Sequence, residues 1–171
     1  MLNREVRPDG TVHLVCLQKK ISVSKRVRDI SEIMRKIKST NTEPEQILRK
    51  ALRVKGFRFR VCPPRLEGKP DIVFPRDKVA VFVDGDFWHG NQWQKRGLTA
   101  LEDQFRQTTA KEYWLKKIRG NMRRDCTITA KLLAGGWTVI RLWESEVKWC
   151  WVSSYSMESL QLTRDILRSR T

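Results

Sequence analysis

Residues 83–93, VDGDFWHGNQW, gather reactive side chains directly after an apolar run. They include Asp84, Asp86 and His89, and the preceding VAVFV (79–83) is typical of a buried strand. Imidazole can take a proton from an attacking water or give one to a leaving oxygen near neutral pH. A lone histidine is usually structural, but this one follows candidate carboxylate ligands for a metal ion, so we predict a catalytic role for His89.

A further carboxylate, Asp71, is predicted to lie at the same edge of the sheet. PDIVF (70–74) and VAVFV (79–83) are joined by PRDK, which indicates a hairpin at the sheet centre. With the turn in the middle of PRDK, antiparallel pairing sets Asp71 opposite about residue 82, which makes it a neighbour of Asp84. Such oxygen ligands suit Mg²⁺. The competing interpretation is that Asp71 merely begins a strand, and the dipeptide PD by itself favours that one.

Three aromatic residues are predicted to contact nucleic acid. Phe87 and Trp88 leave the strand end together, and Trp114 lies at the start of a helix predicted over about residues 108–133. Aromatic residues more often form the core, but a pair flanked by glycine, aspartate and histidine is badly placed for one. Rings at the mouth of a basic cleft can stack on bases or wedge between base steps.

Asp125 lies in the same predicted helix, close to its apolar stripe, and is expected to face inward. A buried acid needs a cationic partner or a metal-bound water. Asp125 is therefore a candidate for the site, with an ordinary ion pair to Arg123 or Arg124 as the alternative.

Helical and strand patterns alternate along the chain. Thr42 and Glu45 form a T-x-x-E capping box at the start of a helix, and this structural role already explains Glu45. The other expected elements are a helix over 29–39, a half-buried strand over 57–61, a polar loop over 91–107, a central strand over 137–143 and a helix over 156–168. This order predicts an α/β domain over residues 29–171, with a mixed sheet flanked by helices, preceded by an N-terminal arm over residues 1–28.

The composition favours a nucleic-acid partner. The 171 residues include 35 Lys and Arg against 19 Asp and Glu, for a net charge of +16 and a pI of about 10.2. This excess favours a polyanion, nucleic acid before membrane, and we expect neither a membrane span nor a signal peptide. Four scattered cysteines without a C-x-x-C pair indicate reduced thiols rather than disulfides or a zinc knuckle. We expect one compact domain, acting as a monomer.

Five stretches together resemble a known family: MRKIKSTNTEPEQILRKAL, GFRFRV, LEGKPDIVFPRDKVAVFVDGDFWHG, EYWLKKIRGNMRRD and GGWTVIRLWE. In this order they are similar to the Vsr family of very short patch repair endonucleases, in the PD-(D/E)XK restriction-endonuclease-like superfamily. The resemblance covers roughly residues 28–146. It implies a three-layer restriction-endonuclease-like fold and a Mg²⁺-dependent enzyme, with Mn²⁺ as an alternative ion. Such an enzyme nicks one strand of double-stranded DNA beside a T:G mismatch, in the bacterial cytoplasm at the nucleoid.

The resemblance also carries roles over to individual positions. It assigns metal binding to Asp71 and to the backbone carbonyl of Val83, and it makes His89 the catalytic histidine. The other matched positions are two acids that hold metal-bound waters or orient the site, Glu45 and Asp125, and three rings that wedge into DNA beside the mismatch, Phe87, Trp88 and Trp114.

Two departures from the family pattern affect the predicted site. Many members bind a structural zinc, and the four matching positions here hold poor or unsuitable ligands, namely Asp86, Asn91, Trp93 and Ser145. We therefore expect no structural zinc, with the loop braced by packing of Trp93 near Trp143 and by a hydrogen bond from Asn91. Asp84 replaces a residue that is commonly histidine. It either adds a carboxylate to the metal site or forms a salt bridge with nearby lysines.

Other functions remain open at this point. A Vsr-like nickase of a restriction or defence system would cut matched or modified DNA instead. A DNA-binding module without catalysis would share the basic charge, but such a binder needs no acids facing phosphate. An RNA-binding protein is a third possibility, although no RNP-like or KH-like signature occurs. Mismatch-repair proteins are candidate partners.

Overall fold

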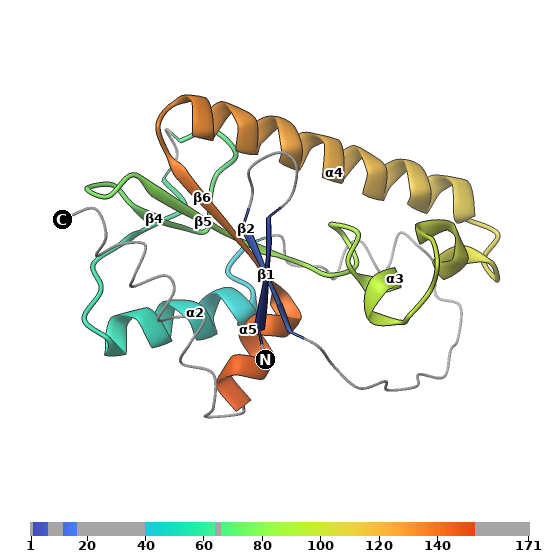
Figure 1. The fold of residues 1–171 in the computed structure, drawn as a ribbon, viewed down its shortest axis with the longest axis horizontal. Coiled ribbons are helices and arrows are strands. Elements are labelled where there is room, and N and C mark those ends of the chain that lie inside the picture. The colour runs from blue at the N-terminus through green and yellow to red at the C-terminus, as the bar shows by residue number, and fades with distance from the viewer. Residues whose placement is uncertain (1, 7–11, 17–39, 64–65, 153–171) are drawn as a thin grey trace.

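The computed structural model describes residues 2–6, 12–16, 40–63 and 66–152 (Figure 1). The helices predicted over residues 29–39 and 156–168 lie outside the described residues. Within the described part the chain forms an α/β fold, with a sheet between helices as predicted.

Six strands form one mixed sheet: β1 (Leu2–Val6), β2 (Val12–Cys16), β3 (Arg60–Val61), β4 (Ile72–Phe74), β5 (Val79–Asp84) and β6 (Thr138–Trp143). Their order in the sheet is β1-β2-β6-β5-β4-β3. The pairs β2–β6 and β5–β6 are parallel, and the other pairs are antiparallel. Two strands, β1 and β2, come from the segment predicted as an arm, and they extend the sheet beyond β6.

Helices cover both faces of this sheet. They are α2 (Glu43–Val54), α3 (Gln92–Lys95), a 3₁₀ helix (Leu101–Phe105), α4 (Lys111–Ala134) and α5 (Glu144–Val152). In Figure 1, α4 runs above the sheet, while α2 and α5 lie together below it. The predicted polar loop over 91–107 thus holds two short helices, and its Phe105 is buried. In the part of the chain that the structure describes, no helix is long and apolar enough to cross a membrane.

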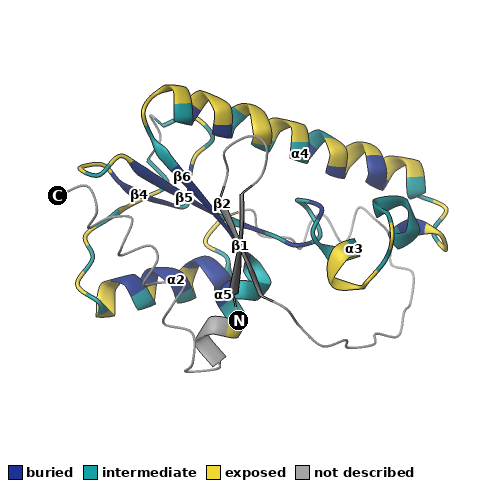
Figure 2. Ribbon diagram, in the orientation of Figure 1, coloured by how far each residue is buried: buried dark blue, intermediate teal, exposed yellow. Residues whose placement is uncertain are grey.

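The central strand β5 sends alternate side chains to the two helical layers. Val81 packs in a cluster with residues of α2, and Phe82 packs in a cluster with residues of α4. Figure 2 shows the core strands β4 and β5 as largely buried between these layers. Because side chains alternate along a strand, Val83 continues the α2 face and Asp84 continues the α4 face.

The predicted hairpin is confirmed. β4 pairs antiparallel with β5, with Ile72 opposite Val81. Residue 71 therefore comes opposite residue 82, as counted from the sequence, and this register brings Asp71 to the end of β5.

Two other local predictions have different outcomes. The capping box is confirmed, because Glu45 Oε1 accepts the backbone N–H of Thr42 at 3.2 Å at the start of α2. The predicted strand over 57–61 is wrong in extent, since only Arg60 and Val61 pair with β4. Phe57 and Phe59 instead pack edge-to-face on the ring of Phe74, with centroids 6.0 and 6.1 Å away.

Candidate active site

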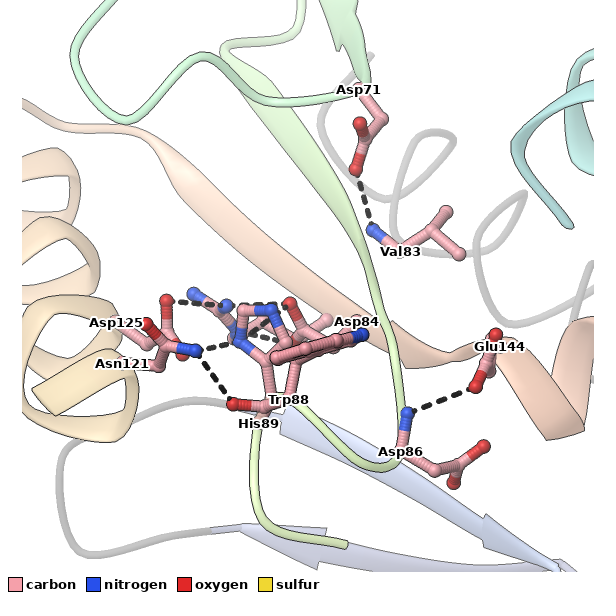
Figure 3. Close-up of polar contacts among 10 residues, drawn as sticks. Asp71, Val83, Asp84, Asp86, Trp88, His89, Asn121, Asp125 and Glu144 are labelled. Carbon is pink, nitrogen blue, oxygen red and sulfur yellow. Dashed lines mark hydrogen bonds and ion pairs between the residues drawn. The ribbon is translucent and has the colours of Figure 1, made fainter. Parts of the chain in front are cut away.

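Polar residues meet in two groups at the end of β5 (Figure 3). The Asp71 group comprises Asp71, the backbone of Val83, and Glu45 and Arg49 from α2. The His89 group comprises Asp84, His89, Asp125 from α4 and Arg141 from β6. The charge of Asp84 raises the pKa of Asp71, so the two groups act on each other electrostatically.

Asp71 takes the place of a strand partner for Val83. Its Oδ2 accepts the Val83 N–H at 2.7 Å, one position before Ile72, the first residue of β4. In an antiparallel ladder the N–H and C=O of one residue point to the same neighbouring strand. The Val83 carbonyl therefore faces the same side as the Asp71 carboxylate, and these two oxygen donors can serve one cation.

The electrostatics of Asp71 fit a cation site. The pKa of Asp71 is raised to about 6: burial is the largest cause and the charges of Glu45 and Asp84 add to it, while the Val83 N–H and Arg49 oppose the shift. The surroundings of Asp71 therefore provide too little positive charge to balance its ionised carboxylate. Among the described residues, no group of three or more His, Cys, Asp or Glu side chains could hold a metal ion. Mg²⁺ suits such a sparse site, because it commonly binds one or two protein oxygens and completes its shell with water and phosphate.

Glu45 lies in this group but its carboxylate is fully engaged. Oε1 accepts from the backbone N–H and the hydroxyl of Thr42, at 3.2 and 2.8 Å. Oε2 accepts from the Asn41 N–H at 3.0 Å and from Arg49 Nη2 at 2.5 Å. Four donors fill the usual acceptor sites of a carboxylate. The buried Glu45 therefore orients the start of α2 and Arg49 and has no lone pair left for a direct metal bond.

His89 and Asp125 form a short hydrogen bond on the other face. His89 Nδ1 lies 2.5 Å from Asp125 Oδ2. Burial alone would raise the pKa of Asp125, but the hydrogen bond from His89 and the charge of Arg141 lower it below its usual value. An ionised carboxylate only accepts, so Nδ1 carries a proton, and in the neutral ring Nε2 is then the atom with the lone pair. Asp125 faces inward as predicted. Its ion-pair partners are His89 and Arg141, and of the two arginines considered from the sequence, Arg123 and Arg124, only Arg124 acts on it, through its charge.

Asp84 is paired with an arginine, not with the lysines considered from the sequence. Arg141 Nε and Nη2 donate to the two Asp84 oxygens at 2.6 Å each, with both side chains buried. Sequence reasoning missed Arg141. The signal for it was a charged residue within the apolar strand WTVIRLW, since a buried charge requires a partner.

The three predicted DNA-contacting rings pack together beside the His89 group. Phe87 lies 4.9 Å from Trp88 and 5.2 Å from Trp114, centroid to centroid, in edge-to-face geometry. Trp114 is buried, while Phe87 and Trp88 are half-buried. The expectation that Phe87 and Trp88 are badly placed for a core is therefore wrong. Asn121 of α4, which sequence reasoning also missed, donates to the Trp88 carbonyl at 2.9 Å and holds the turn.

The loop that carries His89 is tied to the start of α5 through Asp86. Asp86 Oδ1 accepts from Asn91 Nδ2 at 2.6 Å and from the Ser145 hydroxyl at 3.0 Å. Asp86 Oδ2 accepts from the Ser145 N–H at 3.2 Å and lies 3.4 Å from Lys95 Nζ. The predicted hydrogen bond from Asn91 is confirmed. Three of the four positions matched to zinc ligands thus form a hydrogen-bonded network around one buried carboxylate.

Comparison with known proteins identifies the family. The family model described as DNA mismatch endonuclease Vsr matches residues 23–95. The type II nicking enzyme V.NmeDIP of Neisseria meningitidis serogroup C is 41% identical over 114 residues, which cover 67% of this chain and 72% of that enzyme. The chain belongs to the Vsr family of DNA endonucleases. V.NaeI of Lentzea aerocolonigenes, also a type II nicking enzyme, is 40% identical over 122 residues, 68% of each chain.

The Vsr family spans two kinds of named enzyme among these relatives. The DNA mismatch endonuclease Vsr of Escherichia coli K12 is 32% identical over 118 residues, which cover 69% of this chain and 70% of that enzyme. This membership agrees with the resemblance read from the sequence. Of the residues matched to Vsr roles, the structure places Asp71, Val83 and Glu45 in one group, and His89 and Asp125 in the other.

Proposed function

We propose that this Vsr-family endonuclease is Mg²⁺-dependent and nicks one strand of duplex DNA next to a T:G mismatch, in very short patch repair. The observation that supports this proposal is that a candidate cation site and a histidine–carboxylate pair lie at the same end of β5. One is the buried, cation-deficient carboxylate of Asp71 beside the Val83 carbonyl. The other is the His89–Asp125 hydrogen bond.

Asp71 and the Val83 carbonyl would hold the Mg²⁺, and Mn²⁺ would suit the same oxygen donors. A bound Mg²⁺ would polarise the scissile phosphate and offset the charge that develops on it. Glu45 would position Arg49 and the start of α2 rather than bind the ion, because its lone pairs are filled.

His89 would move the proton. Its Nδ1 is committed to Asp125, so Nε2 takes the proton from the attacking water. Asp125 holds the ring in this tautomer and stabilises the imidazolium that forms. Asp84 would take no part in metal binding, because both of its oxygens accept from Arg141.

The DNA would be bound through charge and held open by aromatic rings. A net charge of +16 supplies attraction for the phosphates of the duplex. Phe87 and Trp88, half-buried and backed by Trp114, would present their exposed edges as a wedge between base steps. Unstacking is easiest at a mispair, so this wedge would favour a T:G site. With this substrate we place the enzyme in the bacterial cytoplasm at the nucleoid, acting as a monomer, with mismatch-repair proteins as candidate partners.

We further propose that the fold needs no structural zinc. The hydrogen bonds of Asp86 with Asn91 and Ser145 connect the His89 loop to α5 at positions where other family members bind the ion. A carboxylate, an amide, an indole and a hydroxyl form a poor set of zinc ligands.

A second function has its own support. Two type II nicking enzymes are 41% and 40% identical to this chain, against 32% for the mismatch endonuclease of E. coli. A nickase linked to a restriction system, acting on matched or modified DNA, is therefore the alternative substrate assignment. A catalytically silent DNA-binding module is less well supported, because it would not need the His89–Asp125 pair.

The deciding experiment is a nicking assay on labelled duplexes of one sequence, with and without a single T:G pair, in Mg²⁺ and in EDTA. The proposal expects one strand cut beside the mismatch in Mg²⁺ and no cutting in EDTA. Equal cutting of the T:G and T:A duplexes would move the assignment to the restriction-associated nickase. Absence of cutting on every duplex would favour the silent module.

A further inference from the structure

Arg141 lies in the middle of β6, and its buried guanidinium contacts both carboxylates that lie close to His89 Nδ1. Nε and Nη2 donate to the two oxygens of Asp84 at 2.6 Å each, and Nη2 also lies 3.1 Å from Asp125 Oδ1. The ring of Phe82 lies against the guanidinium, 4.8 Å from its centroid. A planar fork that is bound along two edges and across one face is held in a single orientation.

This arrangement divides the two oxygens of Asp125 between two partners. Oδ1 faces Arg141 at 3.1 Å, and Oδ2 faces His89 Nδ1 at 2.5 Å. The carboxylate is planar, so the contact at Oδ1 sets the direction of Oδ2. Arg141 therefore acts on the His89 ring through Asp125 without touching it.

Arg141 also settles a competition between two carboxylates. Asp84 Oδ1 lies 3.5 Å from His89 Nδ1, so it is a second acceptor close to the same N–H. Its bonds to Arg141 are much shorter, at 2.6 Å. With Asp84 committed to the guanidinium, Asp125 is left as the acceptor for Nδ1.

We infer that Arg141 is a positioning residue, which holds Asp125 against Nδ1 of His89 and withholds Asp84 from it. Nε2 thereby remains the atom that transfers the proton. The consequence for the nicking rate rests on the proposed function, whereas the consequence for the state of the His89 ring does not.

The test uses two variants and a control. Arg141→Met leaves the buried Asp84 and the half-buried Asp125 without their shared cation and is expected to lower stability, so it serves mainly for comparison. Asp84→Leu/Arg141→Met replaces the whole ion pair with apolar side chains, a change that buried pairs often tolerate. Glu67→Gln is the control, because it removes one side of an exposed ion pair with Lys131 that belongs to neither group of polar residues at the end of β5.

The first readout is the protonation pattern of His89 in the protein without metal or DNA. The chain has only two histidines, so ¹⁵N spectra of the imidazoles resolve His89, and His13→Gln assigns it. The wild type and Glu67→Gln should show the Nδ1–H form alone. The double variant should show a mixture of the two neutral forms. A double variant that keeps the pure Nδ1–H form would overturn the inference, because Asp125 would then need no help from Arg141.

The second readout is the nicking rate on the best duplex. For the double variant we expect a fall in kcat of about 10²-fold, the range of a lost general base, with KM changed less than about threefold. A normal kcat in a folded double variant would also overturn the inference. If the wild type cuts no duplex while the ring behaves as expected, the proposed function fails and the positioning role stands.

Discussion

Two carboxylates at the end of β5 are driven in opposite directions by their surroundings. Burial, with Glu45 and Asp84 nearby, raises the pKa of Asp71 to about 6. Asp125 is half-buried, but His89 and Arg141 lower its pKa. Acids with opposite shifts at one site commonly have different roles. Asp71 is suited to a cation that would restore its charge balance, and Asp125 is suited to remain ionised beside an imidazole.

We predict that Asp71→Asn abolishes cleavage, because it removes a proposed metal ligand. The raised pKa of Asp71 further predicts that the same substitution stabilises the free protein. The folded state binds the Asp71 proton more tightly than the unfolded state, so the free energy of unfolding falls as pH rises from about 4 to about 6 and stays lower above. Removing the charge should recover part of this loss, up to about 3 kcal/mol at pH 8. Thermal melts at pH 4 and pH 8 measure it, and the gain should appear only at pH 8.

Mg²⁺ provides the matched control for this variant. It should raise the melting temperature of the wild type and leave that of Asp71→Asn unchanged, because binding to the folded state alone stabilises it. DNA binding by the variant should persist, since phosphate attraction comes from the basic surface. An Asp71→Asn protein that nicks at the wild-type rate would disprove the active-site assignment.

At the scale of helices and strands, the sequence predicted structure formed by neighbouring residues but not the pairing of strands distant in sequence. The β4–β5 hairpin joins neighbours in sequence, so counting from its turn placed Asp71 correctly beside β5. The pairing of β5 with β6 joins segments more than fifty residues apart, and nothing local revealed that Asp84 and Arg141 would meet. For the same reason, no pattern in residues 1–28 indicated that β2 would lie beside β6.

The loop that carries His89 is held by the hydrogen bonds of Asp86, so we predict that it needs no structural zinc. Protein purified without chelator should contain far less than one zinc per chain, and EDTA should leave its melting temperature unchanged. Asp86→Ala should destabilise the fold by about 1–3 kcal/mol, because half-buried partners such as Asn91 lose their acceptor. Elemental analysis and thermal melts measure both. About one zinc per chain, lost together with helicity on chelation, would refute the prediction.

At the scale of the whole molecule, non-specific affinity and recognition have separate sources. The charge of +16 acts on any duplex and weakens with salt. The ring cluster of Phe87, Trp88 and Trp114 is a local feature that matters only where bases unstack. Selectivity should therefore respond to the rings and be almost independent of the net charge.

Trp88→Ala should weaken binding to a T:G duplex more than to the matched T:A duplex. Each lost base–aromatic contact is worth about 1–3 kcal/mol, and it is formed only where the step opens. Titration of both duplexes at one salt concentration gives the ratio of affinities. Tyr113→Ala is the control, since this exposed ring packs edge-to-face on Trp114 without joining the cluster's buried face. Equal losses on both duplexes for Trp88→Ala would assign the ring to core packing.

The alternation of β5 between two helical layers has a consequence for how such an enzyme can diversify. Val83 and the Asp71 group are supported from the α2 side, whereas Asp84 and the His89 group are supported from the α4 side. Substitutions on the α2 side therefore bear first on cation binding, and substitutions on the α4 side bear first on the His89 ring. The two parts of the chemistry can vary separately, so libraries that randomise the α2 face should lose Mg²⁺ affinity first, whereas libraries that randomise α4-facing positions should lose kcat first.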